Sequence, residues 1–338
     1  MITLKQIKNL IEKSENPLIF YDDDPDGLVS YLLLKRHFKK GQGFIVRGKP
    51  MLDASYLESV KKYSPDLVII LDKPVVEQEF VDECNVPIIW IDHHPVIKIK
   101  GVKYYNPRIK NDKDNRCVSY WCYKLTNEDM WLATIGIVSD YQKPSFIKKF
   151  IKEYPELLKE AKDQKEMLFN SNLGKLIKIF GFALKGQTND VRKNVDTLTR
   201  LKNPYDLLHD KNEWLRLLLI KVGKIEKEYD KLLDKAVKEN KGKKIVIFIY
   251  ISGKYSFTGS LSNELMYKFP GKVILVGREK DGDIRMSLRS PEGPKLPKIL
   301  EKALFGVEGY GGGHDYAVGA SVKKEDFDKF IEVIKKEI

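Results

Sequence analysis

Three short apolar runs in the N-terminal part constrain the fold of this chain more than any other feature. They are PLIFY at 17–21, DLVIILD at 66–72 and VPIIWID at 86–92. Apolar residues dominate both faces of each run, as in the strands of a parallel sheet that helices cover on two sides. Residues 27–38 have the spacing of a helix, so strands alternate with helices. We therefore predict an α/β fold with an N-terminal, doubly wound, mostly parallel sheet.

The rest of the chain divides into a helical middle and a second α/β part. Residues 144–240 have mostly helical patterns, and 211–239 read as one long connecting helix. The segment 239–244 breaks that helix, and KIVIFIYIS at 244–252 begins a second series of strands and helices. A chain of 338 residues is long enough for more than one core. We predict an N-terminal domain at 1–200, a helical linker at 201–240 and a smaller C-terminal α/β domain at 241–338.

The net charge of the chain is a weaker guide. Sixty Lys and Arg residues stand against 48 Asp and Glu, a formal net charge of +12. A basic balance favours polyanionic partners such as nucleic acid. Abundant Lys and Glu are also typical of proteins from hot-living organisms, so the charge alone does not select a partner.

Neither a membrane span nor a secretion signal is expected. No run of about 18 apolar residues is present, and residues 1–16 have the pattern of an amphipathic helix rather than of a signal peptide. Cys84, Cys117 and Cys122 lack zinc-binding spacing and cannot all pair. Buried thiols in a reducing compartment are the plain interpretation, so we expect a cytoplasmic protein with no membrane partner.

An acidic loop follows the first apolar run. Asp22, Asp23, Asp24 and Asp26 fall within five positions, where the chain passes from strand into helix. At neutral pH these carboxylates repel one another unless a cation or hydrogen bonds compensate. A loop that only caps the following helix is the alternative, since a helix N-terminus offsets part of such charge.

Acidic and imidazole side chains recur where the later apolar segments end. Asp72 ends the second run, Asp92-His93-His94 end the third, and Asp140 ends a fourth apolar segment, WLATIGIVSD. Open α/β sheets bind ligands beyond the carboxyl ends of their strands. Carboxylates with imidazole suit Mn²⁺ or Mg²⁺ better than a structural zinc site, which prefers thiolates. Taken alone, the histidines are also compatible with a capped turn, but the repetition favours one shared metal site.

These motifs resemble those of the DHH superfamily of phosphoesterases, in particular its RecJ-like nucleases of the archaeal type. The resemblance spans nearly the whole chain and implies a DHH catalytic domain followed by a DHH-associated substrate-binding domain. The matching motifs are Asp22-x-Asp24-x-Asp26-Gly27, Asp72, Asp92-His93-His94, Gly136-x-x-x-Asp140, the run 285–290 (RMSLRS) and Gly311-Gly312-Gly313-His314.

The resemblance implies a role for each matching residue of the N-terminal domain. His94 would face the scissile phosphate as a hydrogen-bond donor or general acid, and Asp92 would orient the histidines from behind. The implied metal ligands are Asp24, Asp26, Asp72, His93 and Asp140.

One position departs from the family pattern. Many members carry a His four residues before the Asp that matches Asp24, and this chain has Phe20 there. Asp22 is the nearest substitute ligand, and Lys73 directly follows Asp72. An ammonium group there would stabilise the carboxylates in place of one cation, so the sequence leaves one or two metal ions open.

In the C-terminal domain the resemblance implies that Arg285, Ser287, Arg289 and His314 bind substrate. The glycines at 311–313 let the backbone approach a phosphate closely, and Arg suits phosphate recognition. A glycine run by itself is equally typical of a flexible turn. The nearby arginine strand favours the functional interpretation.

The sequence therefore predicts a hydrolase, a Mn²⁺- or Mg²⁺-dependent phosphodiesterase that acts as an exonuclease on single-stranded DNA, RNA or both and releases mononucleotides. Because the chain ends soon after the glycine motif, we expect it to lack the extra nucleic-acid-binding domain of bacterial RecJ. In the resemblance that domain helps to set 5′ polarity, so its absence implies a preference for a 3′→5′ direction. Basic residues of the helical middle, among them Arg192 and Lys193, slightly favour a groove that tracks the nucleic-acid backbone over a solvated face.

Two alternatives to the exonuclease remain open, and the products released from a nucleic-acid strand, or their absence, would distinguish them. One is a hydrolase of short oligonucleotides or nucleotide phosphates, similar to the nanoRNases. The other is an inactive replication or repair scaffold, which would bind a strand without releasing nucleotides. Single-stranded nucleic acid and DNA replication or repair proteins are the expected partners.

Overall fold

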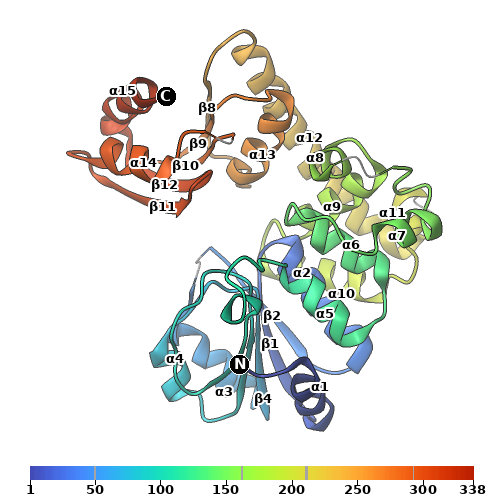
Figure 1. Cartoon of the computed structure of the whole chain (residues 1–338). Coiled ribbons are helices and arrows are strands. Elements are labelled where there is room, and N and C mark those ends of the chain that lie inside the picture. Colours follow the sequence, from blue (N-terminus) through green and yellow to red (C-terminus); the bar gives the residue numbers. More distant parts are fainter. Residues whose placement is uncertain (49–50, 161–162, 210–211, 292) are drawn as a thin grey trace. The chain divides into compact units, whose positions relative to one another are not determined.

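The chain forms two compact units, Met1–Leu219 and Ile220–Ile338. Figure 1 shows the secondary structure of the computed structural model. The structure describes every residue of the chain except 49–50, 161–162, 210–211 and 292. The boundary between the units falls inside the long helix α12 (Glu213–Asn240), and each unit is described by itself.

The N-terminal unit is built on a five-stranded sheet in which every pairing is parallel. The spatial order of the strands is β2 (Gln42–Val46), β1 (Pro17–Asp22), β4 (Leu67–Leu71), β6 (Ile88–Ile91) and β7 (Val102–Tyr105). The predicted parallel α/β sheet is therefore confirmed. The edge strands β2 and β7 were missed because they are only partly buried and lack a continuous apolar run.

Helices cover both faces of this sheet, which explains why β4 and β6 are apolar throughout (Figure 1). One face packs against α3 (Leu57–Tyr63) and α4 (Gln78–Glu83) through a core that includes Phe20 and Trp90. On the other face α2 (Pro25–Phe38) packs on β1. The helices α1 (Leu4–Lys13) and α5 (Val118–Thr126) lie with α2 in the same layer.

The middle of the chain is helical, as predicted. The helix α6 (Met130–Ser139) is buried almost throughout and packs against α2 and α5. The fourth apolar segment is thus a helix, and Asp140 is its C-cap residue. The long helix predicted for 211–239 is α12, although residue 211 lies outside the described part of the chain. The other helices described here are α7 (Ile147–Glu153), α8 (Gln164–Phe169), α9 (Asn172–Ala183), α10 (Thr188–Arg200) and α11 (Tyr205–His209).

Small elements complete the N-terminal unit. The strands β3 (Met51–Leu52) and β5 (Val75–Val76) pair in parallel and form a separate two-stranded sheet. The 3₁₀ turns η1 (Ala54–Tyr56) and η2 (Pro107–Ile109) follow β3 and β7.

The C-terminal unit contains a second, mixed sheet. Its strand order is β11 (Gly309–His314), β12 (Ala317–Lys323), β10 (Asp283–Arg289), β9 (Ile274–Lys280) and β8 (Val246–Ile251). The strands β8 and β9 pair in parallel, and the other neighbouring strands pair antiparallel. This smaller α/β unit confirms the predicted second domain type.

The two faces of the second sheet differ in their cover. The helices α14 (Leu296–Leu304) and α15 (Phe327–Glu337) bury one face in an apolar core. The helix α13 (Thr258–Lys268) packs on β9 and β10, and the 3₁₀ turn η3 (Lys324–Asp326) precedes α15. The edge strand β11 is exposed along its whole length.

Two expectations about the environment of the chain can be compared with the structure. All three cysteines are buried free thiols, as expected. No helix within the described residues is long and apolar enough to cross a membrane.

Gly27 allows the first turn of α2 to lie directly against the end of β1. A Cβ atom at Gly27 would come within 2.7 Å of the Asp22 amide nitrogen and 2.8 Å of its carbonyl oxygen, and backbone atoms cannot move aside as a flexible side chain can. We predict that Gly27→Ala lowers the free energy of unfolding by about 1–3 kcal/mol through overpacking.

Gly223→Ala is the matched control for this prediction, because Gly223 also lies in a helix but a Cβ there meets nothing within 4 Å. Because alanine has a higher helix propensity than glycine, Gly223→Ala should raise the free energy of unfolding by up to about 1 kcal/mol. Urea unfolding of both variants measures the difference. Equal effects of the two substitutions would contradict the packing argument.

Candidate metal centre

Acidic and imidazole side chains gather beyond the carboxyl ends of three neighbouring strands. Asp22 is the last residue of β1, Asp72 directly follows β4, and Asp92-His93-His94 follow β6. Because these strands are parallel and adjacent, their carboxyl ends lie at the same edge of the sheet. Two sets of ligand atoms, each within 4.8 Å of one another, are present among the described residues: Asp22, Asp24 and Asp72 form one, and Asp72, His93 and His94 form the other.

Asp72 belongs to both sets and is the centre of the cluster. The residue is almost fully buried, and its backbone has a left-handed φ of 59°. Non-glycine residues in this conformation carry strain and concentrate at functional sites. Its Oδ1 atom is buried and has no hydrogen-bond partner among the described residues. A buried carboxylate oxygen without a donor is costly, so the site is incomplete without a proton or a cation.

The hydrogen bonding of His93 indicates what kind of ion could bind between His93 and Asp72. Its Nδ1 lies 3.0 Å from the carbonyl oxygen of Asn115, which only accepts, so Nδ1 carries the proton. When the ring is neutral, Nε2 is then an acceptor, and it lies 3.4 Å from Asp72 Oδ1. Two acceptors that face each other at this distance fit a shared metal ion, and oxygen with imidazole ligands suits a divalent ion such as Mn²⁺.

Asp26 lies outside both sets of ligand atoms. It is almost fully buried, and its two carboxylate oxygens accept hydrogen bonds from the backbone N–H groups of Val118 and Ser119, each at 2.9 Å. Those N–H groups belong to the first turn of α5, where a carboxylate is stabilised by the unpaired donors and the helix dipole. The role that the structure gives Asp26 is to join α2 to α5 beside the cluster.

Asp140 also lies outside these sets, but close to them. Its Oδ2 is 3.9 Å from His93 Nδ1 and accepts a hydrogen bond from Gln142 Nε2 at 2.8 Å. The exposed fraction of its side chain is 32%, so this carboxylate remains reachable from solvent.

Asp92 holds His94 from behind. The Asp92 side chain is fully buried, its Oδ1 is 2.7 Å from His94 Nδ1, and its Oδ2 accepts a hydrogen bond from the His94 backbone N–H at 3.1 Å. Tyr104 and Asn106 donate to the same Oδ2 atom at 3.3 and 3.2 Å. The carboxylate therefore fixes the His94 ring with Nδ1 protonated and leaves Nε2 for another partner.

Lys73 supplies a positive charge inside the cluster. Its side chain is fully buried, and its Nζ lies 2.5 Å from Asp22 Oδ1. Phe20, at the position of the family histidine, packs instead into the apolar core against Phe44, Tyr56 and Phe80. One carboxylate of the cluster is thus balanced by an ammonium group.

Gln142 is a residue of the site that the sequence analysis missed. Its Nε2 donates to Asp140 Oδ2 and to the Asn115 carbonyl oxygen, each at 2.8 Å, and its Oε1 accepts from the Cys117 N–H at 3.1 Å. Because Asn115 fixes the His93 ring, Gln142 links both histidine and carboxylate to the loop before α5. A neutral amide two residues after Asp140 gives no signal in the sequence, since only tertiary contacts reveal its partners.

Crowding of negative charge perturbs the protonation of the cluster. Burial, followed by repulsion from Asp24, raises the pKa of Asp22 to about 7 even though Lys73 opposes the shift. Burial, partly offset by His93, raises the pKa of Asp140 to about 7. Burial and the charge of Asp26 raise the pKa of Asp72 well above its usual range. For His93 burial acts downward, but Asp140 and Asp26 outweigh it and raise its pKa.

The substrate-binding residues expected in the C-terminal unit lie on two faces of its sheet. Strand register places Arg285 opposite Ser321, Ser287 opposite Gly319, and Arg289 opposite Ala317. Gly312 and His314 of β11 continue the last two of these rows, so they share a face with the arginines, whereas Gly311 and Gly313 fall in the alternate rows. Arg289 is partly engaged, since its Nε donates to Asn263 Oδ1 at 2.8 Å.

Arg278 is a second residue that the sequence analysis missed. It lies directly opposite Arg285 on β9, and its Nε is buried without a hydrogen-bond partner within the part of the chain that the structure describes. Two like charges side by side on a sheet repel each other unless an anion lies between them. This pair therefore marks the face as suited to a phosphate group.

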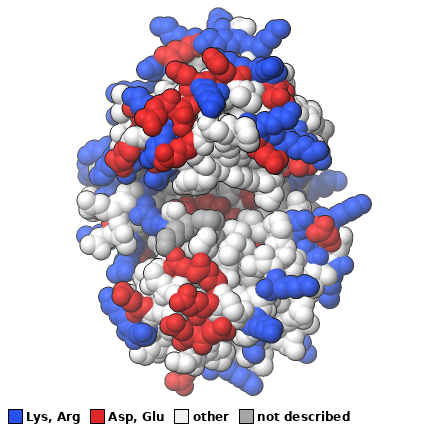
Figure 2. Space-filling model, turned by 90° about the vertical axis from the view of Figure 1, so that its left-hand side faces the viewer, with Lys and Arg blue, Asp and Glu red and all other residues white. Residues whose placement is uncertain are grey.

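Surface charge adds little to this picture. On the face shown in Figure 2, Lys and Arg side chains are interspersed with Asp and Glu, and no continuous basic stripe is formed by the described residues. The expectation of a basic groove therefore remains a prediction.

Comparison with known families identifies the class of protein. The family model described as "DHH family, N-terminal domain" matches residues 17–161, and the "DHHA1 domain" model matches residues 257–338. The chain belongs to the DHH superfamily and has the RecJ-like architecture of a DHH domain followed by a DHHA1 domain, which confirms the predicted superfamily and domain order. The archaeal type stays a prediction. A comparison with curated proteins finds no match.

Solved structures share this fold at low sequence identity. RecJ of Thermus thermophilus in complex with Mn²⁺ superposes with a TM-score of 0.70 at 14% identity over 98% of this chain, which spans 54% of that protein. An exonuclease RecJ bound to manganese gives 0.64 at 14% identity over 99% of this chain and 94% of its own. The DHH domain of a protein assigned to a family of ribosomal proteins gives 0.68 at 16% identity, with 99% and 89% covered. These identities establish a common fold.

The raised pKa values predict how stability depends on pH. A carboxyl group whose pKa is higher in the folded state stabilises the protein below its unfolded pKa near 4, and this stability is lost as pH rises through about 7. In EDTA we expect the melting temperature to fall between about pH 5 and about pH 8. Mn²⁺ should raise it more at the higher pH than at the lower, because protons compete with the ion at low pH.

Asp72→Asn is the control for this experiment, since it removes one titrating carboxyl and the repulsion that it causes. The variant should show a smaller loss of melting temperature with pH and a weaker response to Mn²⁺. The same Mn²⁺-induced shift at both pH values, or an unchanged profile in Asp72→Asn, would contradict the assignment of the cluster.

Proposed function

We propose that this chain is a metal-dependent phosphodiesterase that acts as an exonuclease on single-stranded nucleic acid and releases mononucleotides. The observation that carries the proposal is the buried Asp72 Oδ1, which has no hydrogen-bond partner among the described residues and faces the His93 Nε2 atom at 3.4 Å. The structures of RecJ with Mn²⁺ and of exonuclease RecJ bound to manganese support it through their common fold.

The residues present fit a divalent ion. Asp72 and His93 would hold it together with Asp24, whose carboxylate lies within the same set as Asp72. An ion bound there lowers the pKa of a bound water and polarises a phosphoryl oxygen. Asp140 lies beside His93 and keeps part of its carboxylate in solvent, so it would accept a proton from the attacking water.

His94 would act on the phosphate. Asp92 holds its Nδ1–H, so the Nε2 atom of a protonated His94 would donate to a phosphate oxygen or to the leaving oxygen. The side chain is 28% exposed, which leaves that nitrogen accessible. Its place within 4.8 Å of Asp72 and His93 also puts it close to the ion that they would hold.

The arginines of the C-terminal sheet would hold the backbone of the nucleic acid. Arg278 and Arg285 are neighbours across β9 and β10, and the glycine-lined rows beside them leave the sheet surface open. Backbone phosphates bind such a surface without regard to sequence, which suits an enzyme that removes nucleotides one after another.

We further propose that the centre holds one ion rather than two. Lys73 is fully buried, and its ammonium group pairs with Asp22, which is the carboxylate nearest to the position of the missing family histidine. A second cation beside an ammonium group would meet repulsion that the low dielectric of the interior strengthens. Lys73 would thus take over the electrostatic part of a second ion.

Cleavage of labelled strands tests the proposed function. With Mn²⁺ present we expect wild-type protein to release mononucleotides from a single strand, and we expect Asp72→Asn and His93→Ala to lose at least about 10²-fold in rate because metal and phosphate are no longer held. Asp112→Asn is the matched control, since Asp112 is exposed and its ion pair with Arg108 lies on the surface.

The products decide between the alternatives. Substrates labelled at the 5′ or the 3′ end, as DNA and as RNA, report polarity and sugar preference, with 3′→5′ expected. Faster hydrolysis of fragments of a few nucleotides than of long strands would favour an oligonucleotide hydrolase. Strand binding without release of any nucleotide would reject the proposed enzyme and favour a scaffold.

The metal content tests the role of Lys73. Wild-type protein dialysed against Mn²⁺ should retain one ion per chain by elemental analysis. Lys73→Met leaves Asp22 without its ammonium partner and should admit a second ion, while Lys62→Met, which removes an exposed lysine, should not change the count. Two ions in the wild type would show that Lys73 does not substitute for a cation.

A further inference from the structure

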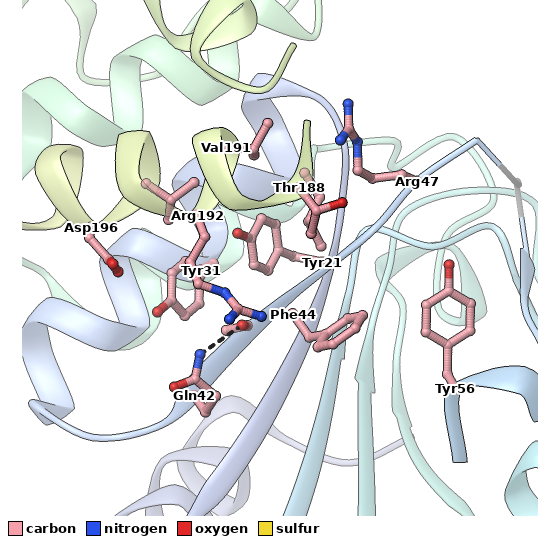
Figure 3. A pocket seen from close by; sticks show the side chains of 13 residues that line it. Tyr21, Tyr31, Gln42, Phe44, Arg47, Tyr56, Thr188, Val191, Arg192 and Asp196 are labelled. Carbon is pink, nitrogen blue, oxygen red and sulfur yellow. Dashed lines mark hydrogen bonds between the residues drawn. The ribbon is translucent and has the colours of Figure 1, made fainter. Parts of the chain in front are cut away.

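A cavity of the N-terminal unit, separate from the metal centre, lies where α10 crosses the sheet edge formed by β2 (Figure 3). Its volume is about 200 Å³, which equals the liquid volume of about seven water molecules. Residues of β1, α2, β2, η1 and α10 line it. None of the acidic and histidine residues of the metal centre is among these lining residues.

The cavity has an aromatic floor. On one face of the sheet edge the rings of Tyr21 and Tyr31 stack with centroids 4.7 Å apart and an interplanar angle of 6°. On the other face, which Phe44 shares with Phe20, Phe44 meets Tyr56 edge-on at 6.0 Å. Gly43 is what lets Tyr31 lie flat against β2, because a Cβ atom there would fall 2.4 Å from the ring. Only 3% of Tyr21 and 5% of Tyr31 is exposed, so a planar ligand would meet the small accessible part of these rings, which favours edge contact over full stacking.

The hydroxyl groups of the floor are hydrogen-bond donors at any physiological pH. Burial, with the nearby charge of Asp196, raises the pKa of Tyr31 to about 12. The Tyr31 phenol therefore remains neutral beside a ligand.

Two opposite charges face the cavity from α10. Arg192 and Asp196 are one helical turn apart, a spacing at which such side chains usually pair. Neither forms a hydrogen bond or an ion pair with any residue that the structure describes. Figure 3 shows Arg192 reaching from α10 toward Gln42, with Asp196 on the same side of the helix. The lining thus presents an exposed cation and an exposed anion, and neither has an ion-pair partner within the described chain.

The walls are held in place independently of any ligand. Arg47 of the β2 end donates from Nη1 to the Gly186 carbonyl at 2.9 Å and from Nη2 to the Leu184 carbonyl at 3.2 Å. These bonds tie the connection between α9 and α10 to the sheet edge. A preformed cavity binds small ligands with little loss of conformational entropy.

We propose that this cavity is a binding site for a nucleoside monophosphate. The base would lie against the accessible part of Tyr21 and Tyr31, Asp196 would accept hydrogen bonds from ribose hydroxyl or base N–H groups, and Arg192 would pair with the phosphate. A ligand with a planar ring, donors and an anion matches all three features, whereas an apolar ligand would leave both charges unpaired. The site goes beyond the proposed function, since it requires neither metal nor bond cleavage.

Calorimetric titration of AMP and UMP into the full chain tests this site. The titration is done in EDTA, so that no metal-held phosphate at the acidic cluster contributes. We expect Arg192→Ala to weaken AMP binding by about tenfold or more through loss of a charge-assisted contact, and to leave adenosine binding unchanged. Asp196→Asn should weaken adenosine and AMP alike.

Lys193→Ala is the matched control, since Lys193 is an exposed cation on the same helix that does not line the cavity. It should change AMP affinity by less than about twofold. Asp72→Asn should retain AMP binding, so a failure of the proposed catalysis and a failure of the nucleotide site are distinguishable.

Three results would overturn the proposal. The first is that wild-type protein binds neither AMP nor UMP. The second is that Arg192→Ala and Lys193→Ala lose the same affinity for AMP. The third is that Asp72→Asn loses AMP binding while the cavity variants Arg192→Ala and Asp196→Asn keep it. Wild-type protein that ignores nucleotides but binds an extended peptide along β2 would assign the cavity to a protein partner instead.

Discussion

Repulsion among carboxylates at one edge of a parallel sheet is the constraint on which the rest of the N-terminal unit depends. Neighbouring parallel strands end at the same edge of a sheet, so Asp22 at the end of β1 and Asp72 after β4 lie close together. The chain offsets two of its negative charges with its own groups, Asp26 with the first turn of α5 and Asp22 with Lys73. Asp72 is left with a buried oxygen that has no donor among the described residues and that a bound cation would satisfy.

Hydrogen bonds from uncharged groups help to position the charged side chains of this centre. The Asn115 carbonyl sets the tautomer of His93, and Gln142 holds that carbonyl and Asp140 together. His94 is held by Asp92, and Asp92 in turn accepts a hydrogen bond from Asn106. Ligand direction thus depends on uncharged residues as well as on Asp92, and such supporting hydrogen bonds commonly fix a metal site before the ion arrives.

Alternation along β1 separates two kinds of chemistry. Adjacent residues of a strand point to opposite faces, so Asp22 joins the acidic cluster while Tyr21 lies on the floor of the aromatic cavity. The same rule arranges the C-terminal sheet, where Arg285 and Ser287 share one face and Met286 and Leu288 enter the core on the other. In both units, one strand serves the core and a polar surface together.

By itself, the sequence determined the parallel sheet and the identity of its acidic edge, because β1, β4 and β6 are apolar on both faces and end in Asp or Asp-His-His. It did not reveal the edge strands β2 and β7, the hydrogen bonds of Asp26, or the positions of Gln142 and Arg278. Periodicity reports what a local segment buries, whereas these features depend on which distant segments meet. Only the tertiary structure decided that Asp26 joins two helices, and that Arg192 lines the same cavity as tyrosines from another part of the chain.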